Sequence, residues 1–76
     1  MAQDLVSLIV HNLVTVPDAV SVDASEDNRG VRIEIRCAAD DAGRIIGRGG
    51  RIINSIRTLA RAAGDGGQRV EVQLIE

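Results

Sequence analysis

The sequence predicts an α+β fold in which three helices and three strands form two layers of one domain, residues 1–76. Three segments in which apolar and polar residues alternate predict the strands, and three segments with helical spacing of apolar residues predict the helices. The 76 residues include no Phe, Tyr or Trp, so small aliphatic residues must fill the interior, which favours a thin, two-layer fold. The predicted order is helix, strand, strand, helix, glycine turn, helix, strand.

The first half of the chain is predicted to contain one helix and a pair of strands. The helix is expected over residues 4–15, because Pro17 disfavours helical geometry in the residue before it. Residues 19–23 alternate as a strand, and residues 25–30 form a polar turn. Residues 31–37 alternate again and predict the second strand.

The first helix has an unusually wide apolar face. Its apolar residues sweep an arc of about 240°, wider than the stripe that one packed face requires. The residues expected to face the sheet are Leu5, Ile9 and Leu13. Val10 and Val14 lie towards one edge of the arc, and Leu8 lies at the opposite edge. We expect at least one edge to stay uncovered in a monomer, unless the hairpin turn or the last strand covers it.

The second half of the chain is predicted to hold two helices and a closing strand. Asp40 or Asp41 can cap a short helix that runs to Ile46, where the glycines of residues 47–50 break it. A longer helix follows over residues 51–63, with one buried face formed by Ile52, Ile53, Ile56, Leu59, Ala60 and Ala63. The glycines expected to end this helix are Gly64, Gly66 and Gly67.

The polar face of the longer helix and the last strand complete the prediction. The polar face carries Asn54, Arg57, Thr58 and Arg61, which are expected to be solvated rather than to take part in a binding site. Residues 69–75 alternate as the third strand.

Positive charge is concentrated around the glycine turn, although the chain has a net charge of −2. Residues 42–64 contain five arginines and no acidic residue. Glycines without Cβ atoms at the start of a helix let an anion approach backbone N–H groups and the positive end of the helix dipole. The turn is thus suited to hold the backbone of a polyanion. A G-x-x-G spacing alone is also compatible with an ordinary connection between two helices.

The turn and its flanks resemble a known signature. The letters IIGRGGRII of residues 45–53, followed by Ile56, are similar to the K-homology (KH) pattern I-I-G-x-x-G-x-x-I-x-x-I. The order of predicted elements looks like the bacterial, type II arrangement of that domain. The short chain is similar to the KhpA family of small stand-alone KH proteins. Arg in the loop, where Lys is usual, and Ala42, where a larger residue is common, are small departures.

The resemblance implies a three-stranded sheet with three helices packed on one face, and a groove for single-stranded RNA whose loop clamps about four nucleotides. Matched by position, the clamp consists of Gly47, Arg48, Gly49 and Gly50. The apolar positions of the motif, which fix the two helices and border the groove, are Ile45, Ile46 and Ile53. Arg44 and Arg51 flank the loop, where each could pair with a phosphate or be a solvated charge.

The favoured function is therefore RNA binding without catalysis, as a post-transcriptional regulator or RNA chaperone. The alternative is a protein-interaction module that acts by homodimerisation or by docking on a larger KH-domain partner, which the resemblance identifies as KhpB-like. No carboxylate pair, nucleophile–base pair or metal cluster is evident, and no cofactor or small-molecule substrate is expected. Cys37 is expected to be a small buried hydrophobe, and His11 to be solvated. No membrane segment or signal peptide is recognised, so a cytoplasmic location is expected.

Overall fold

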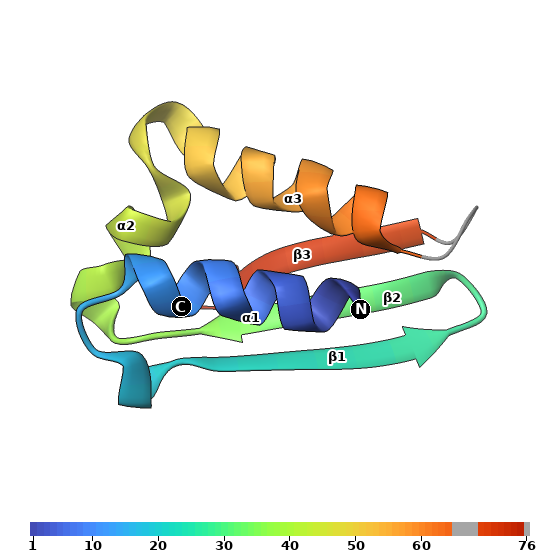
Figure 1. The fold of residues 1–76 in the computed structure, drawn as a ribbon, viewed down its shortest axis with the longest axis horizontal. Helices are drawn as coiled ribbons and strands as arrows, with labels where there is room; N and C mark the ends of the chain where they lie inside the picture. Colours follow the sequence, from blue (N-terminus) through green and yellow to red (C-terminus); the bar gives the residue numbers. More distant parts are fainter. Residues whose placement is uncertain (65–68, 76) are drawn as a thin grey trace.

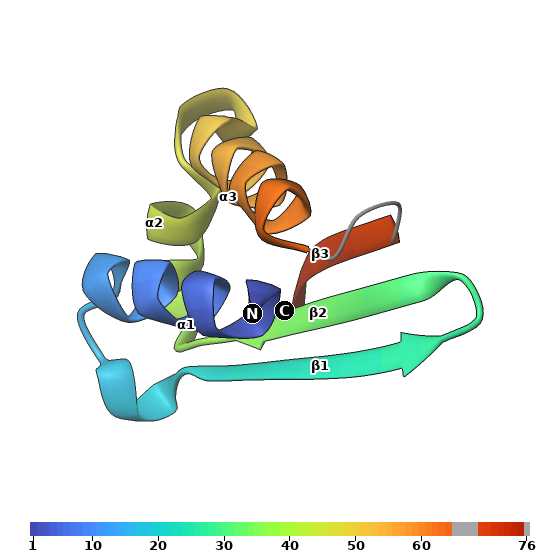
Figure 2. The same cartoon turned by 45° about the vertical axis from the view of Figure 1, so that its right-hand side comes forward.

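The computed structural model describes residues 1–64 and 69–75, which form a three-stranded sheet with the helices over one of its faces (Figure 1; Figure 2). The helices and strands are α1 (Ala2–Leu13), β1 (Ser21–Asp27), β2 (Gly30–Arg36), α2 (Ala42–Ile46), α3 (Arg51–Ala63) and β3 (Arg69–Ile75). This order confirms the α+β prediction and agrees with a type II KH domain. Gly64 follows α3 as predicted, while Gly66 and Gly67 lie outside the described residues.

The sheet is mixed, with β2 in its centre. β1 pairs antiparallel with β2, and β3 pairs parallel with β2. β1 begins later than the predicted segment 19–23, since Pro17–Ala19 form a 3-10 helix. β1 also ends later, because the Asp27 carboxylate organises a tight turn. Its Oδ1 accepts hydrogen bonds from the backbone N–H groups of Arg29 (2.7 Å) and Gly30 (3.2 Å). Most of the predicted polar turn, residues 25–30, is therefore paired in the sheet.

The core lies between the sheet and the helices. Alternate residues of β2 and β3 point into it, among them Ile33, Ile35 and Val72. The helices contribute the buried residues Ala2, Val6, Val10, Ile45, Ile53, Ile56 and Ala60. The opposite sheet face is exposed and carries surface ion pairs such as Arg36 with Asp23 (3.6 Å). Such pairs contribute little to stability, so apolar burial on the helical side holds the two layers together.

The row of α1 that faces the core differs from the prediction. Val6 and Val10 are fully buried, whereas partial burial is found for Leu5, Ile9 and Leu13. α1 packs against both α3 and β1, and the side of its wide apolar arc that carries Val6 and Val10, rather than the middle of the arc, faces these elements. The edge that carries Val10 and Val14 is therefore covered, since Val10 is buried and Val14 also packs against the core.

The opposite edge of α1 is uncovered, as was predicted for at least one edge. The side chain of Leu8 is 64% exposed. On α3, Leu59 was predicted to be buried but is 48% exposed. It lies at the margin of the apolar face, beyond Ile52 and Ala63, which are themselves only partly buried. The helical layer thus presents one exposed leucine on α1 and one on α3.

Asp41 is buried and does not cap α2 with its side chain, in contrast to the prediction. Its residue is 1% exposed, and its carboxylate accepts hydrogen bonds from the Thr15 backbone N–H, the Thr15 hydroxyl (2.8 Å) and the Val16 N–H (3.1 Å). Arg44 Nε lies 3.5 Å from Asp41 Oδ1. Burial alone would raise the pKa of Asp41, but these hydrogen bonds and the Arg44 charge outweigh it and lower the pKa below its ordinary value.

This lowered pKa predicts acid-sensitive stability. Because the folded protein holds Asp41 ionised more strongly than the unfolded chain does, its contribution is complete above about pH 4, the ordinary carboxyl range, and is lost as the pH falls through the folded-state pKa. In Asp41→Asn, an amide NH₂ replaces one acceptor oxygen and faces N–H donors. We expect a lower urea midpoint near neutral pH and a shallower loss of stability in acid than in the wild type.

Urea titrations at neutral and acidic pH measure this effect. Asp40→Asn is the control, because it removes the same charge from an exposed neighbour. Equal acid sensitivity in the wild type and Asp41→Asn would show that the buried carboxylate does not contribute as described.

Candidate functional site

The glycine loop, residues 47–50, connects α2 to α3 through backbone angles that favour glycine. Gly47 has φ 74° and ψ 172°, and Gly49 and Gly50 have φ values of 64° and 79°. In the described chain, every residue with a positive φ is a glycine, and these three belong to that group. Side chains with a Cβ rarely adopt such angles, so the glycines allow the chain to reverse between the two helices within four residues.

The individual glycines face different surroundings. A Cβ at Gly47 would lie 2.6 Å from Ile52 Cγ1, so this position is closed by packing as well as by its φ angle. A Cβ at Gly49 would meet no atom within 4 Å, so the Gly49 backbone is open to solvent. Ile52 lies on the predicted buried face of α3, but its contact with Gly47 has no signal in the sequence pattern. The loop is therefore anchored at Gly47 and accessible at Gly49.

Two backbone N–H groups of the loop are available to a ligand. Gly47 donates to the Gly43 carbonyl (2.9 Å), Gly50 donates to Gly47, and Arg51 donates to Arg48. Within the described ranges, the N–H groups of Arg48 and Gly49 have no protein acceptor. No side chain caps the N-terminus of α3, and its first turn holds no acidic residue. The positive end of the helix dipole is thus free to attract an anion.

Three predicted arginines surround the loop in different ways. Arg48 and Arg51 are exposed, and no ion pair in residues 1–64 or 69–75 involves either guanidinium. Arg44 is also exposed, but its Nε lies near Asp41 Oδ1 (3.5 Å). Arg48 and Arg51 can therefore pair with an incoming phosphate without breaking an internal contact, whereas Arg44 shares its charge with Asp41.

The predicted isoleucines support the loop from below. Ile45 is fully buried and Ile53 is 6% exposed, while Ile46 is partly buried and packs against the core. Ile45 can therefore act on the site only by fixing α2. Ile53 does the same for α3, immediately after the loop. Only Ile46 of the three has appreciable surface beside the loop.

Arg57 is not simply solvated, in contrast to the prediction for the polar face of α3. Its Nε donates to the Val72 carbonyl (3.1 Å), and its Nη1 donates to Asn54 Oδ1 (3.0 Å). The side chain therefore links α3 to β3, which forms one edge of the sheet. A contact over 15 residues of sequence gives no local signal, so sequence spacing could not reveal it.

Other kinds of site find little support in the described chain. Among residues 1–64 and 69–75, no group of three or more His, Cys, Asp or Glu side chains could hold a metal ion. Cys37 is partly buried and packs against the core, close to its predicted role. None of the helices that the structure describes has both the length and the apolar character needed to cross a membrane.

Comparisons with known proteins agree with this geometry. Residues 3–74 match the family described as "KhpA/KhpB, KH domain". The chain is 42% identical over 69 residues to the Mycobacterium tuberculosis protein named "RNA-binding protein KhpA", covering 91% of this chain and 86% of that protein. The Streptomyces coelicolor protein of the same name is 36% identical over 72 residues, covering 95% and 91%. The Caldanaerobacter subterraneus protein of that name is 43% identical over 60 residues, covering 79% and 80%. The chain therefore belongs to the KhpA/KhpB family of KH-domain proteins.

Proposed function

We propose that this chain binds single-stranded RNA and that the glycine loop holds the RNA backbone. The observation that carries the proposal is the pair of free N–H groups, on Arg48 and Gly49, at the open N-terminal end of α3. The relatives named "RNA-binding protein KhpA" support the same function, and the family is non-enzymatic. The chain acts in this proposal by binding alone.

The proposed contacts are made by backbone and arginine together. A phosphate that approaches Gly49 meets no side chain of the described residues, so its oxygens can accept hydrogen bonds directly from the free N–H groups of the loop. Arg48 and Arg51 then supply charge-assisted hydrogen bonds from either side. The absence of acidic residues from 42 to 64 lets these charges act locally although the whole chain is acidic.

The proposed path of the bases runs from the loop along α3 towards β3. On this side Arg57 contacts both Asn54 and the edge strand, so its remaining N–H groups are held in a fixed position. The chain contains no Phe, Tyr or Trp on which a base could stack. Base recognition would therefore rest on hydrogen bonds, and sequence preference should be weak. Weak preference suits a protein that serves many RNAs, as a post-transcriptional regulator or RNA chaperone.

The loop is tested by Arg48→Asp together with Gly49→Asp. These changes place two negative charges where a phosphate should bind, and we expect the affinity for a labelled single-stranded RNA to fall at least about tenfold, which corresponds to about 1.4 kcal/mol. The fold should persist, because the space beside Gly49 is open and Asp tolerates its left-handed geometry at a cost of roughly 1–2 kcal/mol.

Fluorescence anisotropy measures the affinity, and circular dichroism checks the fold. Arg48→Asp is also measured by itself. Arg36→Asp is the control for this single variant, since it makes the same change in charge on the outer face of the sheet. Affinities that stay equal to that of the wild type in folded variants would remove the loop from the RNA site.

A second candidate function, association with another KH domain, is supported by the exposed leucines. Leu8 and Leu59 are 64% and 48% exposed on helices that pack against each other. A contiguous exposed apolar patch is typical of a surface that a partner covers, and in this proposal the two leucines contribute to one. The partner in this proposal is either a second copy of the chain or the larger KhpB-type member of the same family.

Leu8→Glu with Leu59→Glu tests this second function. Both side chains lie outside the core, so we expect a folded protein whose self-association is weakened, while RNA affinity falls only through the loss of avidity. Sedimentation velocity over a concentration range, for wild type and variant, measures the association. A wild type that is monomeric throughout, or an oligomer that both substitutions leave intact, would contradict self-association through these leucines.

A further inference from the structure

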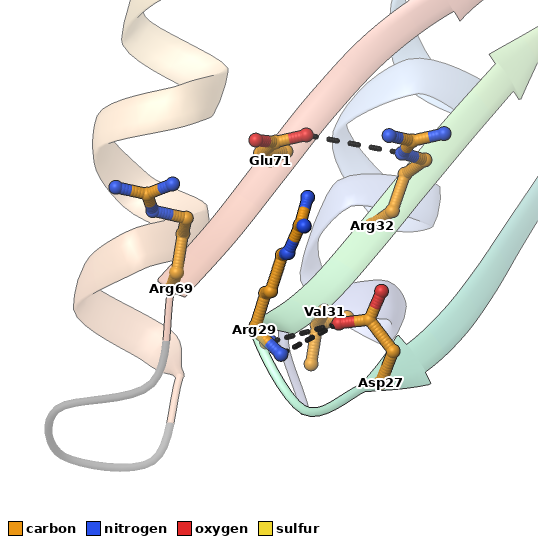
Figure 3. A pocket seen from close by; sticks show the side chains of 7 residues that line it. Asp27, Arg29, Val31, Arg32, Arg69 and Glu71 are labelled. Atoms are coloured by element: carbon orange, nitrogen blue, oxygen red, sulfur yellow. Dashed lines mark hydrogen bonds and ion pairs between the residues drawn. The ribbon is translucent and has the colours of Figure 1, made fainter.

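A second cluster of arginines lies at the end of the fold opposite the glycine loop. Arg29, Arg32 and Arg69 line a surface cavity of ≈ 60 Å³, the hairpin-end pocket, together with Asp27, Gly30, Val31 and Glu71 (Figure 3). The pocket lies where the turn between β1 and β2 meets the start of β3. Its volume is several times the roughly 10–15 Å³ that a single water molecule requires.

The backbone brings two of these arginines together. Gly30 and Arg69 are the first paired residues of β2 and β3, and a Cβ at Gly30 would lie only 2.1 Å from the Arg69 carbonyl oxygen. Gly30 also has φ 141°, which favours glycine. Because Arg29 directly precedes Gly30, this close approach places Arg29 beside Arg69. Figure 3 shows the Arg29 side chain between those of Arg69 and Arg32.

The two carboxylates of the pocket already have partners. Asp27 Oδ1 accepts hydrogen bonds from the backbone N–H groups of Arg29 and Gly30, and these bonds stabilise the turn. Glu71 Oε2 lies 3.8 Å from Arg32 Nε. In the part of the chain that the structure describes, no ion pair involves the guanidinium of Arg29 or Arg69. Among residues 1–64 and 69–75, two neighbouring guanidinium groups therefore have no anionic partner.

We propose that the hairpin-end pocket binds a phosphate group between Arg29 and Arg69. Guanidinium groups present planar pairs of donors that match two oxygens of a phosphate, and two of them can hold one phosphate from opposite sides. The phosphate belongs to the RNA strand that the glycine loop holds, so this assignment rests on the proposed function. Free inorganic phosphate has the same chemistry and is distinguished by the experiment.

The positions of the two sites explain which RNA would reach the pocket. α3 starts at the glycine loop and ends beside the start of β3, so the two sites lie near opposite ends of this helix (Figure 1). Its 13 residues span about 20 Å. The loop accounts for about four nucleotides, so only a longer strand can continue past the end of α3 to the pocket.

Two RNA lengths separate the pocket from the loop. With an RNA of about twelve nucleotides, Arg29→Gln with Arg69→Gln should weaken binding at least about threefold and make the slope of log affinity against log salt shallower by about 0.7, the value for one phosphate contact. With about four nucleotides, binding should stay unchanged. Arg48→Asp with Gly49→Asp should weaken both RNAs. Arg36→Gln, on the same sheet face but paired with Asp23 and Glu34, is the single-charge control for each Arg→Gln variant.

A second arm uses inorganic phosphate and needs no RNA. In the wild type, the NMR signals of the Arg29 and Arg69 Nε–H groups should shift on titration with phosphate, and that of Arg36 should not. A response to phosphate without an effect on the longer RNA upholds the phosphate site and assigns it to a free anion. No response in either arm overturns the proposal. Failure of the proposed function is a separate result, in which the loop variant binds the short RNA as tightly as the wild type.

Discussion

The buried carboxylate of Asp41 is the contact on which the placement of the glycine loop depends. Within the described chain it is the one charged residue that is buried, and it joins the segment after α1 to the segment before α2. The exposed guanidinium of Arg44 lies 3.5 Å from Asp41 Oδ1 and partly offsets the negative charge of the carboxylate. Without this carboxylate, the backbone N–H groups of Thr15 and Val16 would lose their protein acceptor, and the two segments would no longer be joined. One side chain thus fixes both the path of the chain and the start of the site.

The glycine loop combines a rigid side with an open side. Packing of Ile52 against Gly47 and the buried Ile45 and Ile53 fix the two helices that flank the loop. The Arg48–Gly49 segment, by contrast, has N–H groups without an acceptor and no side chain over Gly49 among the residues that the structure describes. Because the donors are held in place before a ligand arrives, little ordering should be required when a phosphate binds. The loop needs no large pocket to provide this contact.

Local sequence patterns predicted the helices and strands. They did not predict features that depend on contacts between residues distant in the sequence. The bounds of α3 and β3 agree with the predicted segments 51–63 and 69–75. α3 has a clear helical period of apolar residues and lies between Gly50 and Gly64, and β3 has a clear alternation of buried and exposed residues. The buried row of α1 was misassigned, since an arc of about 240° fits several orientations and only the neighbouring elements select one. Asp41 looked like a helix cap because its partners lie 25 and 26 residues away in sequence. The loop residues were recognised from their motif, whereas the Arg57 contact was not.

The response of individual backbone N–H groups to RNA tests the proposed role of the glycine loop directly. In ¹H–¹⁵N NMR spectra recorded during titration with a short single-stranded RNA, we expect the largest shifts at Arg48 and Gly49, with smaller shifts along α3. The signals of the outer sheet face around Arg36 should stay in place. Shifts confined to the surface around Leu8 and Leu59, with Arg48 and Gly49 unchanged at saturation, would contradict the central claim that the glycine loop holds the RNA backbone.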